Sequence, residues 1–175
     1  MHNFLDITYL KNGNELQQNV YHLLKTHRVL EILNEYQPIV VGTIPIEINI
    51  ENSDIDIVGE AIDFDKAESY LIEPFSTYTD FKINQQISNN KACLTCNFFI
   101  ESFEIEIYLE HKKPTEQNAY RHMLIEAQVL EKFGKEFKNN IIQLKKNGYK
   151  TEPAFAKLLH LQGDPYAALL EYKIN

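Results

Sequence analysis

The chain has 175 residues and the composition of a globular protein, with 44% hydrophobic and 24% charged residues, which excludes a disordered segment. Its length suits one domain, or one domain with a helical extension. A formal net charge of −8 argues against general affinity for nucleic acid, because such binding depends on clustered Lys and Arg that release counter-ions from phosphates.

Neither a secretory signal nor a membrane span is predicted. The N-terminal sequence MHNFLDITYLKNG lacks a basic region followed by an apolar run and a cleavage site, and no apolar run reaches the roughly 18 residues of a membrane helix. We therefore expect a cytoplasmic protein without membrane partners.

Cys93 and Cys96 form a C-x-x-C pair on an expected strand, where residues three apart point to opposite faces. This geometry favours two buried thiols over a metal or redox site.

The first half of the chain predicts helices and strands in alternation. Asn14 is the expected cap of a helix over 15–36, which Pro38 ends. A strand follows over 39–42, and 43–53 is expected to be extended or an irregular turn, because its isoleucines alternate with polar residues or proline. Further elements are a strand at 54–58, a helix over 66–72, and three strands over 78–87, 92–100 and 103–109, with hairpin turns at 89–91 and 101–102.

The remainder of the chain reads as helical. A helix is expected from Pro114 to Phe133, with Gly134 as its stop, and a second over 135–147 that ends at Gly148. Two short helices are expected near 152–162 and 165–173, with Thr151 and Asp164 as their N-cap candidates. The sequence therefore predicts an α+β fold with a mixed β-sheet flanked by helices. Residues 1–112 are expected to form the core, and 113–175 a C-terminal helical extension packed on it.

Paired carboxylates mark two of the expected strands. Asp54 and Asp56 alternate with isoleucines, so they share one face and lie about 7 Å apart along the strand. Glu104 and Glu106 repeat this pattern on the 103–109 strand. Carboxylates gathered in this way need a counter-ion, and oxygen ligands suit Mg²⁺ or Mn²⁺.

The carboxylate strand also carries a resemblance to a known superfamily. Gly42-Thr43 followed at a distance by Ser53-Asp54-Ile55-Asp56-Ile57-Val58 resembles the signature of the nucleotidyltransferases, with the DNA polymerase beta-like or minimal nucleotidyltransferase fold. Across most of the chain, the sequence is similar to an uncharacterised bacterial family of that superfamily. The segments that carry this wider similarity are GTIPIEI, SDIDIV, EIYL, QNAYRHMLIE, LKKNGYKTEPAFAKLL and LQGDPYAALL.

The resemblance implies a role for each residue that matches the signature. Gly42 and Thr43 would hold the nucleotide phosphates, with threonine in place of the usual serine. Asp54 and Asp56 would be metal ligands. The third carboxylate falls on Glu106, a glutamate in place of the usual aspartate, with Glu104 as the alternative two residues earlier.

The segment after Gly42-Thr43 departs from the superfamily, whose minimal members have arginines there. Residues 44–50 contain no basic residue and include Glu47. Compensating cations would have to come from elsewhere, and Arg121 is the expected phosphate contact. Lys82, His122 and Lys150 are further candidates, although His122 also suits an ordinary i, i+4 pair with Glu126.

Three functions are compatible with these patterns. The first is a magnesium-dependent nucleotidyltransferase that moves a nucleoside monophosphate from a nucleoside triphosphate to a hydroxyl of an unknown small molecule or protein. The alternative is a catalytically inactive module of the same fold that binds a nucleotide or a partner protein. A phosphohydrolase is a third, less favoured class, because the same metals could direct water at a phosphate.

Overall fold

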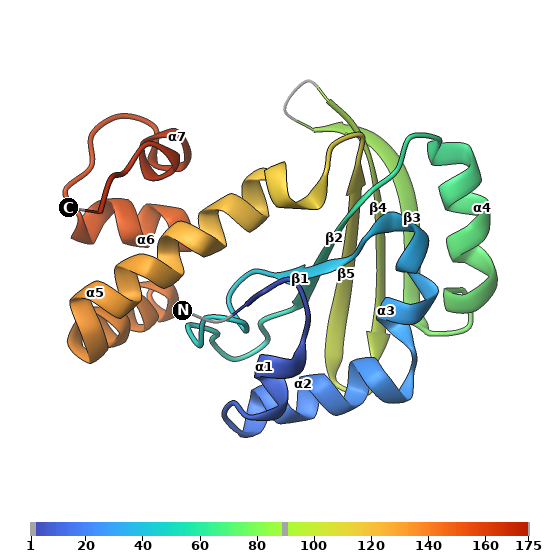
Figure 1. Ribbon diagram of the computed structural model, residues 1–175, viewed down its shortest axis with the longest axis horizontal. Helices are drawn as coiled ribbons and strands as arrows, with labels where there is room; N and C mark the ends of the chain where they lie inside the picture. Colours follow the sequence, from blue (N-terminus) through green and yellow to red (C-terminus); the bar gives the residue numbers. More distant parts are fainter. Residues whose placement is uncertain (1–2, 89–90, 175) are drawn as a thin grey trace.

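The computed structural model describes residues 3–88 and 91–174, in which helices flank a five-stranded sheet of order β1-β2-β5-β4-β3 (Figure 1). The predicted mixed α+β architecture is confirmed. The strands β2 and β5 are parallel, and the other neighbouring pairs are antiparallel. The strands are β1 (Ile39–Val41), β2 (Ile55–Glu60), β3 (Thr79–Ser88), β4 (Lys91–Ile100) and β5 (Phe103–Glu110).

The central strand pair fixes which carboxylates become neighbours. In the parallel register of β2 with β5, Asp56 pairs with Glu106 and Ile57 with Ile107. Both isoleucines are buried, because alternate residues of a strand face opposite sides and one side of this pair packs in the core. The antiparallel register of β4 then places Asn97 next to Glu106.

The predicted single helix over 15–36 is wrong in one respect, because the chain breaks it into three pieces. These are α2 (Glu15–Thr26), α3 (Val29–Ile32) and the 3₁₀ turn η1 (Asn34–Tyr36), preceded by a short α1 (Thr8–Lys11). Arg28 adopts a left-handed conformation with φ 54°, which ends the α2 direction. The break redirects the chain so that Val29 and Leu33 become buried in the core.

A helix and a turn form beside the β-strands where the sequence predicts them, with different helix bounds. The helix α4 (Phe64–Phe75) is longer than expected, and the Asp63 side chain caps it by accepting a hydrogen bond from the Lys66 amide. Pro74 lies in its last turn. Glu101 has φ 55° in the turn between β4 and β5. The other expected hairpin turn centres on residues 89–90, which lie outside the described residues.

The C-terminal part is helical, as predicted. A 3₁₀ turn η2 (Pro114–Glu116) leads into α5 (Asn118–Lys146), which is interrupted at the expected position because Gly134 has φ 75° and ψ −163°. The helices α6 (Thr151–Leu158) and α7 (Pro165–Leu170) follow. The Asp164 side chain caps α7 as expected, whereas Lys150, not Thr151, precedes α6.

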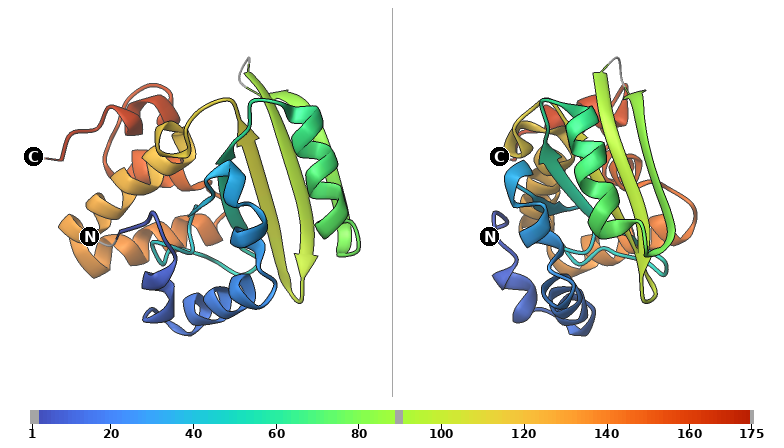
Figure 2. Two further views of the ribbon diagram at one scale, coloured as in Figure 1. Left: turned by 45° about the vertical axis from the view of Figure 1, so that its right-hand side comes forward. Right: turned by 90° about the vertical axis from the view of Figure 1, so that its right-hand side faces the viewer.

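The helices cover different parts of the sheet. Figure 1 shows α5, α6 and α7 on one side of the sheet and α4 on the other, and the turned views agree (Figure 2). Contacts join α4 to β3 and β4, and α5 to β1. The C-terminal helices contribute to the same hydrophobic core as the strands, through Met123, Val129, Ile141, Phe155 and Leu169. Among the described residues, no helix is long and apolar enough to cross a membrane.

Candidate functional site

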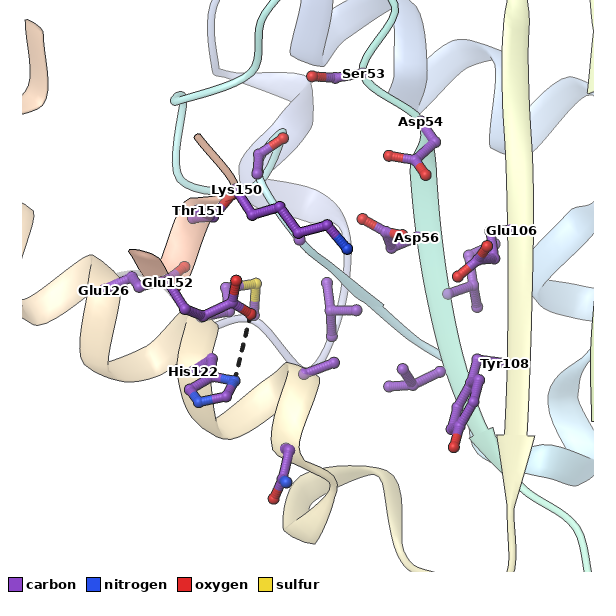
Figure 3. A pocket seen from close by; sticks show the side chains of 18 of the residues that line it. Ser53, Asp54, Asp56, Glu106, Tyr108, His122, Glu126, Lys150, Thr151 and Glu152 are labelled. Atoms are coloured by element: carbon purple, nitrogen blue, oxygen red, sulfur yellow. Dashed lines mark ion pairs between the residues drawn. The ribbon is translucent and has the colours of Figure 1, made fainter. Parts of the chain in front are cut away.

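A cavity of about 650 Å³ lies between the sheet and the C-terminal helices. Figure 3 shows its two sides, with Asp54, Asp56 and Glu106 on the strands facing His122 and Glu152 on the helices. The polar and charged residues that line it are Thr43, Glu51, Asn52, Ser53, Asp54, Asp56, Glu106, Tyr108, Glu110, Gln117, Asn118, His122, Glu126, Lys145, Lys150, Thr151 and Glu152.

The end of β1 approaches the carboxylates through Gly42. Its φ of +81° is a conformation that L side chains rarely adopt, and a Cβ built on it would lie 2.0 Å from Asp56 Oδ2. Only glycine fits at this position, because any side chain would be strained and would collide with the carboxylate. Thr43 follows directly and also lines the cavity.

The structure brings three predicted carboxylates to this one cavity. Asp56 and Glu106 are neighbours on the parallel strands β2 and β5, and Asp54 lies just before β2 begins at Ile55. All three side chains are labelled on the strand side of the cavity in Figure 3. The period-two spacing of the two aspartates and the pairing of β2 with β5 together create this group.

Crowding of these carboxylates alters the proton affinity of Asp56. Burial, together with the negative charges of Asp54 and Glu106, raises the pKa of Asp56 to about 8, whereas Lys145 opposes the shift. A half-buried carboxylate with two acidic neighbours is stabilised either by a proton or by a cation. The site therefore favours the binding of positive charge.

The donor set has the chemistry that a hard divalent cation requires. Carboxylate oxygens are the usual protein ligands of Mg²⁺ and Mn²⁺, which complete their coordination with phosphate oxygens and water. Within residues 3–88 and 91–174, however, no group of three His, Cys, Asp or Glu side chains is arranged so that it could hold a metal ion. The three carboxylates, Asp54, Asp56 and Glu106, are therefore of the type that binds Mg²⁺ or Mn²⁺. Their arrangement does not form a complete coordination shell.

The two glutamates of β5 differ in position. Glu106 lines the cavity, whereas Glu104 is not among its lining residues. The Asn97 amide donates to both, at 3.2 Å to Glu106 Oε2 and 3.4 Å to Glu104 Oε1. Asn97 therefore orients the Glu106 carboxylate from the β4 side.

Of the cations considered from the sequence, two enter the cavity and two do not. His122 and Lys150 line it, and the Lys150 side chain points toward Asp56 in Figure 3. Arg121 is exposed on α5 and Lys82 is exposed on β3, and neither is a lining residue. Adjacent helical residues are about 100° apart around the axis, so Arg121 turns away where His122 faces the cavity.

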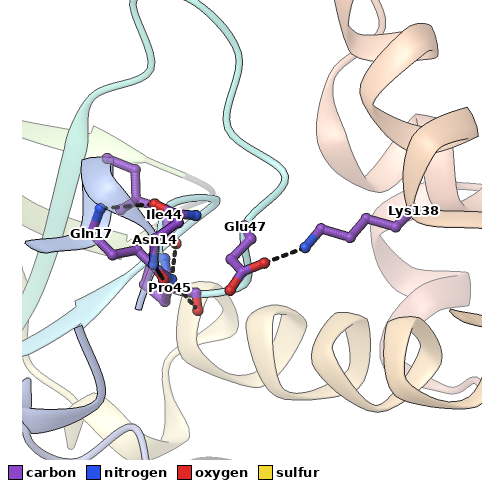
Figure 4. Close-up of polar contacts among 6 residues, drawn as sticks. All are labelled: Asn14, Gln17, Ile44, Pro45, Glu47 and Lys138. Atoms are coloured by element: carbon purple, nitrogen blue, oxygen red, sulfur yellow. Dashed lines mark hydrogen bonds and ion pairs between the residues drawn. The ribbon is translucent and has the colours of Figure 1, made fainter. Parts of the chain in front are cut away.

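Residues 44–47 of the irregular segment between Thr43 and Ser53 are anchored away from the carboxylates. Buried Gln17 donates to the carbonyls of Ile44, at 2.9 Å, and Pro45, at 3.2 Å. Figure 4 shows Glu47 paired with Lys138 of α5, and Glu47 lines a separate cavity of about 330 Å³. Glu47 therefore does not enter the larger cavity, whereas Glu51 of the same segment lines it.

Sequence reasoning missed Lys145 as a lining residue. The side chain is buried, and its Nζ donates to the Ile48 carbonyl at 2.9 Å. Burial lowers the pKa of Lys145, and nearby carboxylates, first Glu126 and then Asp54 and Asp56, oppose that shift. A lysine near a helix C-terminus is ordinarily a solvated residue, so the sequence carried no signal for its burial.

Two glutamates of the helical side were also missed as site residues. The sequence suggested an ion pair of His122 with Glu126, but His122 Nδ1 instead lies 3.6 Å from Glu152 Oε1. Glu126 is buried, and its burial together with the charge of Glu152 raises the pKa of Glu126 to about 8, against the opposing effect of Lys145. The interruption of α5 at Gly134 brings Glu126 and Lys145 together, and the packing of α6 on α5 adds Glu152.

Comparison with solved structures identifies proteins of similar fold. Cid1, an RNA terminal uridylyl transferase, matches with a TM-score of 0.55 and 14% identity over 79% of this chain and 45% of its own. Cid1 poly(U) polymerase with Mg 3′-dATP bound matches with a TM-score of 0.56 and 12% identity over 93% and 52%. The GLD-2/RNP-8 complex matches with a TM-score of 0.55 and 14% identity over 87% and 61%.

These similarities show a nucleotidyltransferase-like fold, as the resemblance of the signature residues implied. The chain spans between 45% and 61% of the length of these three matched chains. Comparison with curated proteins gives no significant match. The family model described as "Domain of unknown function (DUF4269)" matches residues 22–172, and the chain therefore belongs to that family.

Proposed function

We propose that the protein is a metal-dependent nucleotidyltransferase that transfers a nucleoside monophosphate from a nucleoside triphosphate to a hydroxyl of a small molecule or protein. The observation that supports this function best is the position of Asp54, Asp56 and Glu106, which line one cavity beside Gly42. Related support comes from Cid1, whose structures include bound MgGTP and Mg 3′-dATP.

Each residue has a distinct task in the proposed reaction. Asp54, Asp56 and Glu106 would hold Mg²⁺ or Mn²⁺, which when bound supplies positive charge to the phosphate oxygens. The backbone of Gly42 and Thr43 would contact the phosphates, since no side chain at residue 42 blocks their approach. Lys150, which lines the cavity, would add a phosphate contact, and Arg121 keeps this role only if its exposed side chain reorients.

The proposed transfer conserves atoms and charge. The acceptor hydroxyl oxygen forms a bond to the α-phosphorus, and the bond from that phosphorus to the oxygen bridging to the β-phosphate breaks. Diphosphate leaves with the bonding electron pair. Glu106, held by Asn97, would accept the hydroxyl proton, and this assignment rests on its place in the cavity beside Asp56.

Calorimetric titration with each of the four nucleoside triphosphates and Mg²⁺ tests this function. The native chain is expected to bind at least one of them only with Mg²⁺, and Asp54→Asn is expected to lose that binding. Asp80→Asn is the matched control, because it removes the same charge from an exposed position on β3 outside the cavity. Absence of binding for all four nucleotides, or an equal loss in both variants, overturns the proposal.

A binding module without turnover is the second candidate. It is favoured by the lack of a preassembled metal-binding group among the described residues and of basic residues in 44–50. Mass spectrometry of a mixture of hydroxyl-bearing acceptors, incubated with Mg²⁺ and the bound nucleotide, separates the two. A mass increase equal to a nucleoside monophosphate supports the transferase, and tight binding without product supports the module. Release of phosphate to water alone indicates a phosphohydrolase.

A further inference from the structure

The cavity as a whole is lined by more carboxyl groups than its lysines could offset. Seven carboxylates line the whole cavity, against Lys145 and Lys150. Three of these carboxylates belong to the proposed metal site on the strands. On the opposite side, His122 and Glu126 of α5 and Glu152 of α6 form a group that we name the acidic helical wall.

Glu126 is the buried member of the acidic helical wall. Its side chain lines the cavity although only 3% of the residue is exposed. Within the part of the chain that the structure describes, Glu126 has neither a hydrogen bond nor an ion pair. A buried carboxyl group without partners is costly to maintain, and its presence in a cavity points to a ligand that completes its hydrogen bonds.

Glu152 also retains free acceptor capacity, although it lies beside His122. His122 Nε2 is 2.9 Å from the Tyr166 carbonyl. Because a carbonyl only accepts, Nε2 carries the hydrogen of that contact. His122 Nδ1 faces Glu152, but its distance of 3.6 Å from Glu152 Oε1 is longer than a hydrogen bond.

Lys145 does not neutralise the acidic helical wall by direct contact. Its Nζ donates to the Ile48 carbonyl, and no ion pair joins it to Glu126 or Glu152 among the described residues. Its charge acts on Glu126 only through space. Two carboxyl groups thus remain available on the side of the cavity opposite the proposed phosphate site.

We propose that the acidic helical wall binds the ammonium group of the acceptor, so that the substrate is a hydroxyl-bearing amine. An ammonium group has three hydrogen-bond donors and a positive charge, so it would take the place of the proton on the buried Glu126 carboxyl group and pair with the Glu152 carboxylate. The proposal rests on the proposed transferase function and assigns its acceptor. An RNA acceptor fits less well, because its phosphates would face Glu126 and Glu152.

Glucosamine and glucose form a suitable pair of probes, because they differ in one amino group and both carry hydroxyls. Ligand-observed NMR titration of the whole chain without nucleotide is expected to show glucosamine binding about tenfold more tightly than glucose, as one charge-assisted contact of about 1.4 kcal/mol implies. Glu126→Gln and Glu152→Gln should each remove this preference. Two variants are used because Glu126 is buried, and circular dichroism checks that each remains folded.

Glu73→Gln is the matched control, because Glu73 is exposed on α4 outside the cavity. It makes the same substitution away from the cavity and should leave the glucosamine preference unchanged. Equal binding of the two sugars, or an equal loss in all three variants, overturns the inference whatever the nucleotide titrations give. Conversely, selective glucosamine binding without Mg²⁺-dependent nucleotide binding overturns the proposed function but supports the ammonium-binding site. Extension of an RNA oligonucleotide in preference to glucosamine modification also overturns the inference.

Discussion

Gly42 and Asp56 are in such close approach that a single added methyl group would not fit between them. A Cβ at Gly42 would lie 2.0 Å from Asp56 Oδ2 and 3.0 Å from its Cγ. The positive φ of Gly42 and the place of Asp56 on β2 are therefore coupled. A change at either residue is expected to alter the other.

Gly42→Ala tests this coupling. The left-handed conformation costs an alanine about 1–2 kcal/mol, and displacement of Asp56 adds to that cost. We expect a loss of stability of about 2–4 kcal/mol in urea unfolding and loss of Mg²⁺-dependent nucleotide binding.

Gly163→Ala separates the conformational cost of a positive φ from the steric collision of an added Cβ. Gly163 has a similar φ of +84° but no atom within 4 Å of an added Cβ. It should show only the conformational cost and keep nucleotide binding. If both variants lose the same stability and both bind nucleotide, Gly42 does not position Asp56.

Glu126 should make stability depend on pH. Because its pKa in the folded chain is raised to about 8, the folded state holds a proton that the unfolded chain releases. The stabilisation is complete below about pH 4 and is lost as the pH rises through about 8. At about 1.4 kcal/mol for each pKa unit, the loss is on the order of 4–5 kcal/mol.

Urea unfolding of native chain and Glu126→Gln between pH 4 and 9 measures this effect. The variant should lose less stability as the pH rises, because the amide cannot ionise. Glu152 and Lys145, which also act on Glu126, remain in both proteins. Parallel curves for the native chain and the variant would contradict the prediction.

Lys145→Met should destabilise the fold and the site together. The substitution leaves the Ile48 carbonyl without its donor and removes the positive charge that opposes the raised pKa values of Asp56 and Glu126. The expected loss is about 2–4 kcal/mol, since it breaks a buried hydrogen bond and a charge contact. Chemical denaturation measures it.

Lys138→Met is the control for Lys145, because it removes the other lysine that ties α5 to the 43–53 segment. The pair of Lys138 with Glu47 is partly exposed, so its loss should cost about 1 kcal/mol or less. A larger effect for Lys138 than for Lys145 would show that the burial of Lys145 contributes little to stability.

Gln17→Ala should loosen the segment that follows Thr43. Gln17 is buried and bonds the carbonyls of Ile44 and Pro45 as well as the Asn14 amide, so its removal leaves acceptors unpaired at a cost of about 2–3 kcal/mol. Hydrogen exchange should rise at residues 44–48.

Gln18→Ala is the neighbouring control on the same helix, with one exposed hydrogen bond to the Gly13 carbonyl. It should cost less than about 0.5 kcal/mol and leave exchange at 44–48 unchanged. Similar exchange in the two variants would show that Gln17 does not anchor this segment.

The sequence predicted most of the helices and strands, because the caps and interruptions that bound them depend on residues close together in the chain. The capping residues Asn14 and Asp164 and the interruption at Gly134 lie where the sequence places them. The predicted helix over 15–36 failed because nothing in the sequence marks Arg28 as left-handed. That conformation follows from the burial of Val29 and Leu33, which is a tertiary effect.

By itself, the sequence determined that Asp54 and Asp56 share a face, because side chains alternate along a strand. It also determined that the residue before Thr43 can adopt a positive φ, because that residue is glycine. The tertiary structure decided that Glu106 lines the cavity and Glu104 does not. It also decided that Glu126, Glu152 and Lys145 face the strands. The pairing of β2 with β5, the interruption of α5 at Gly134 and the packing of α6 on α5 bring these charges into one cavity.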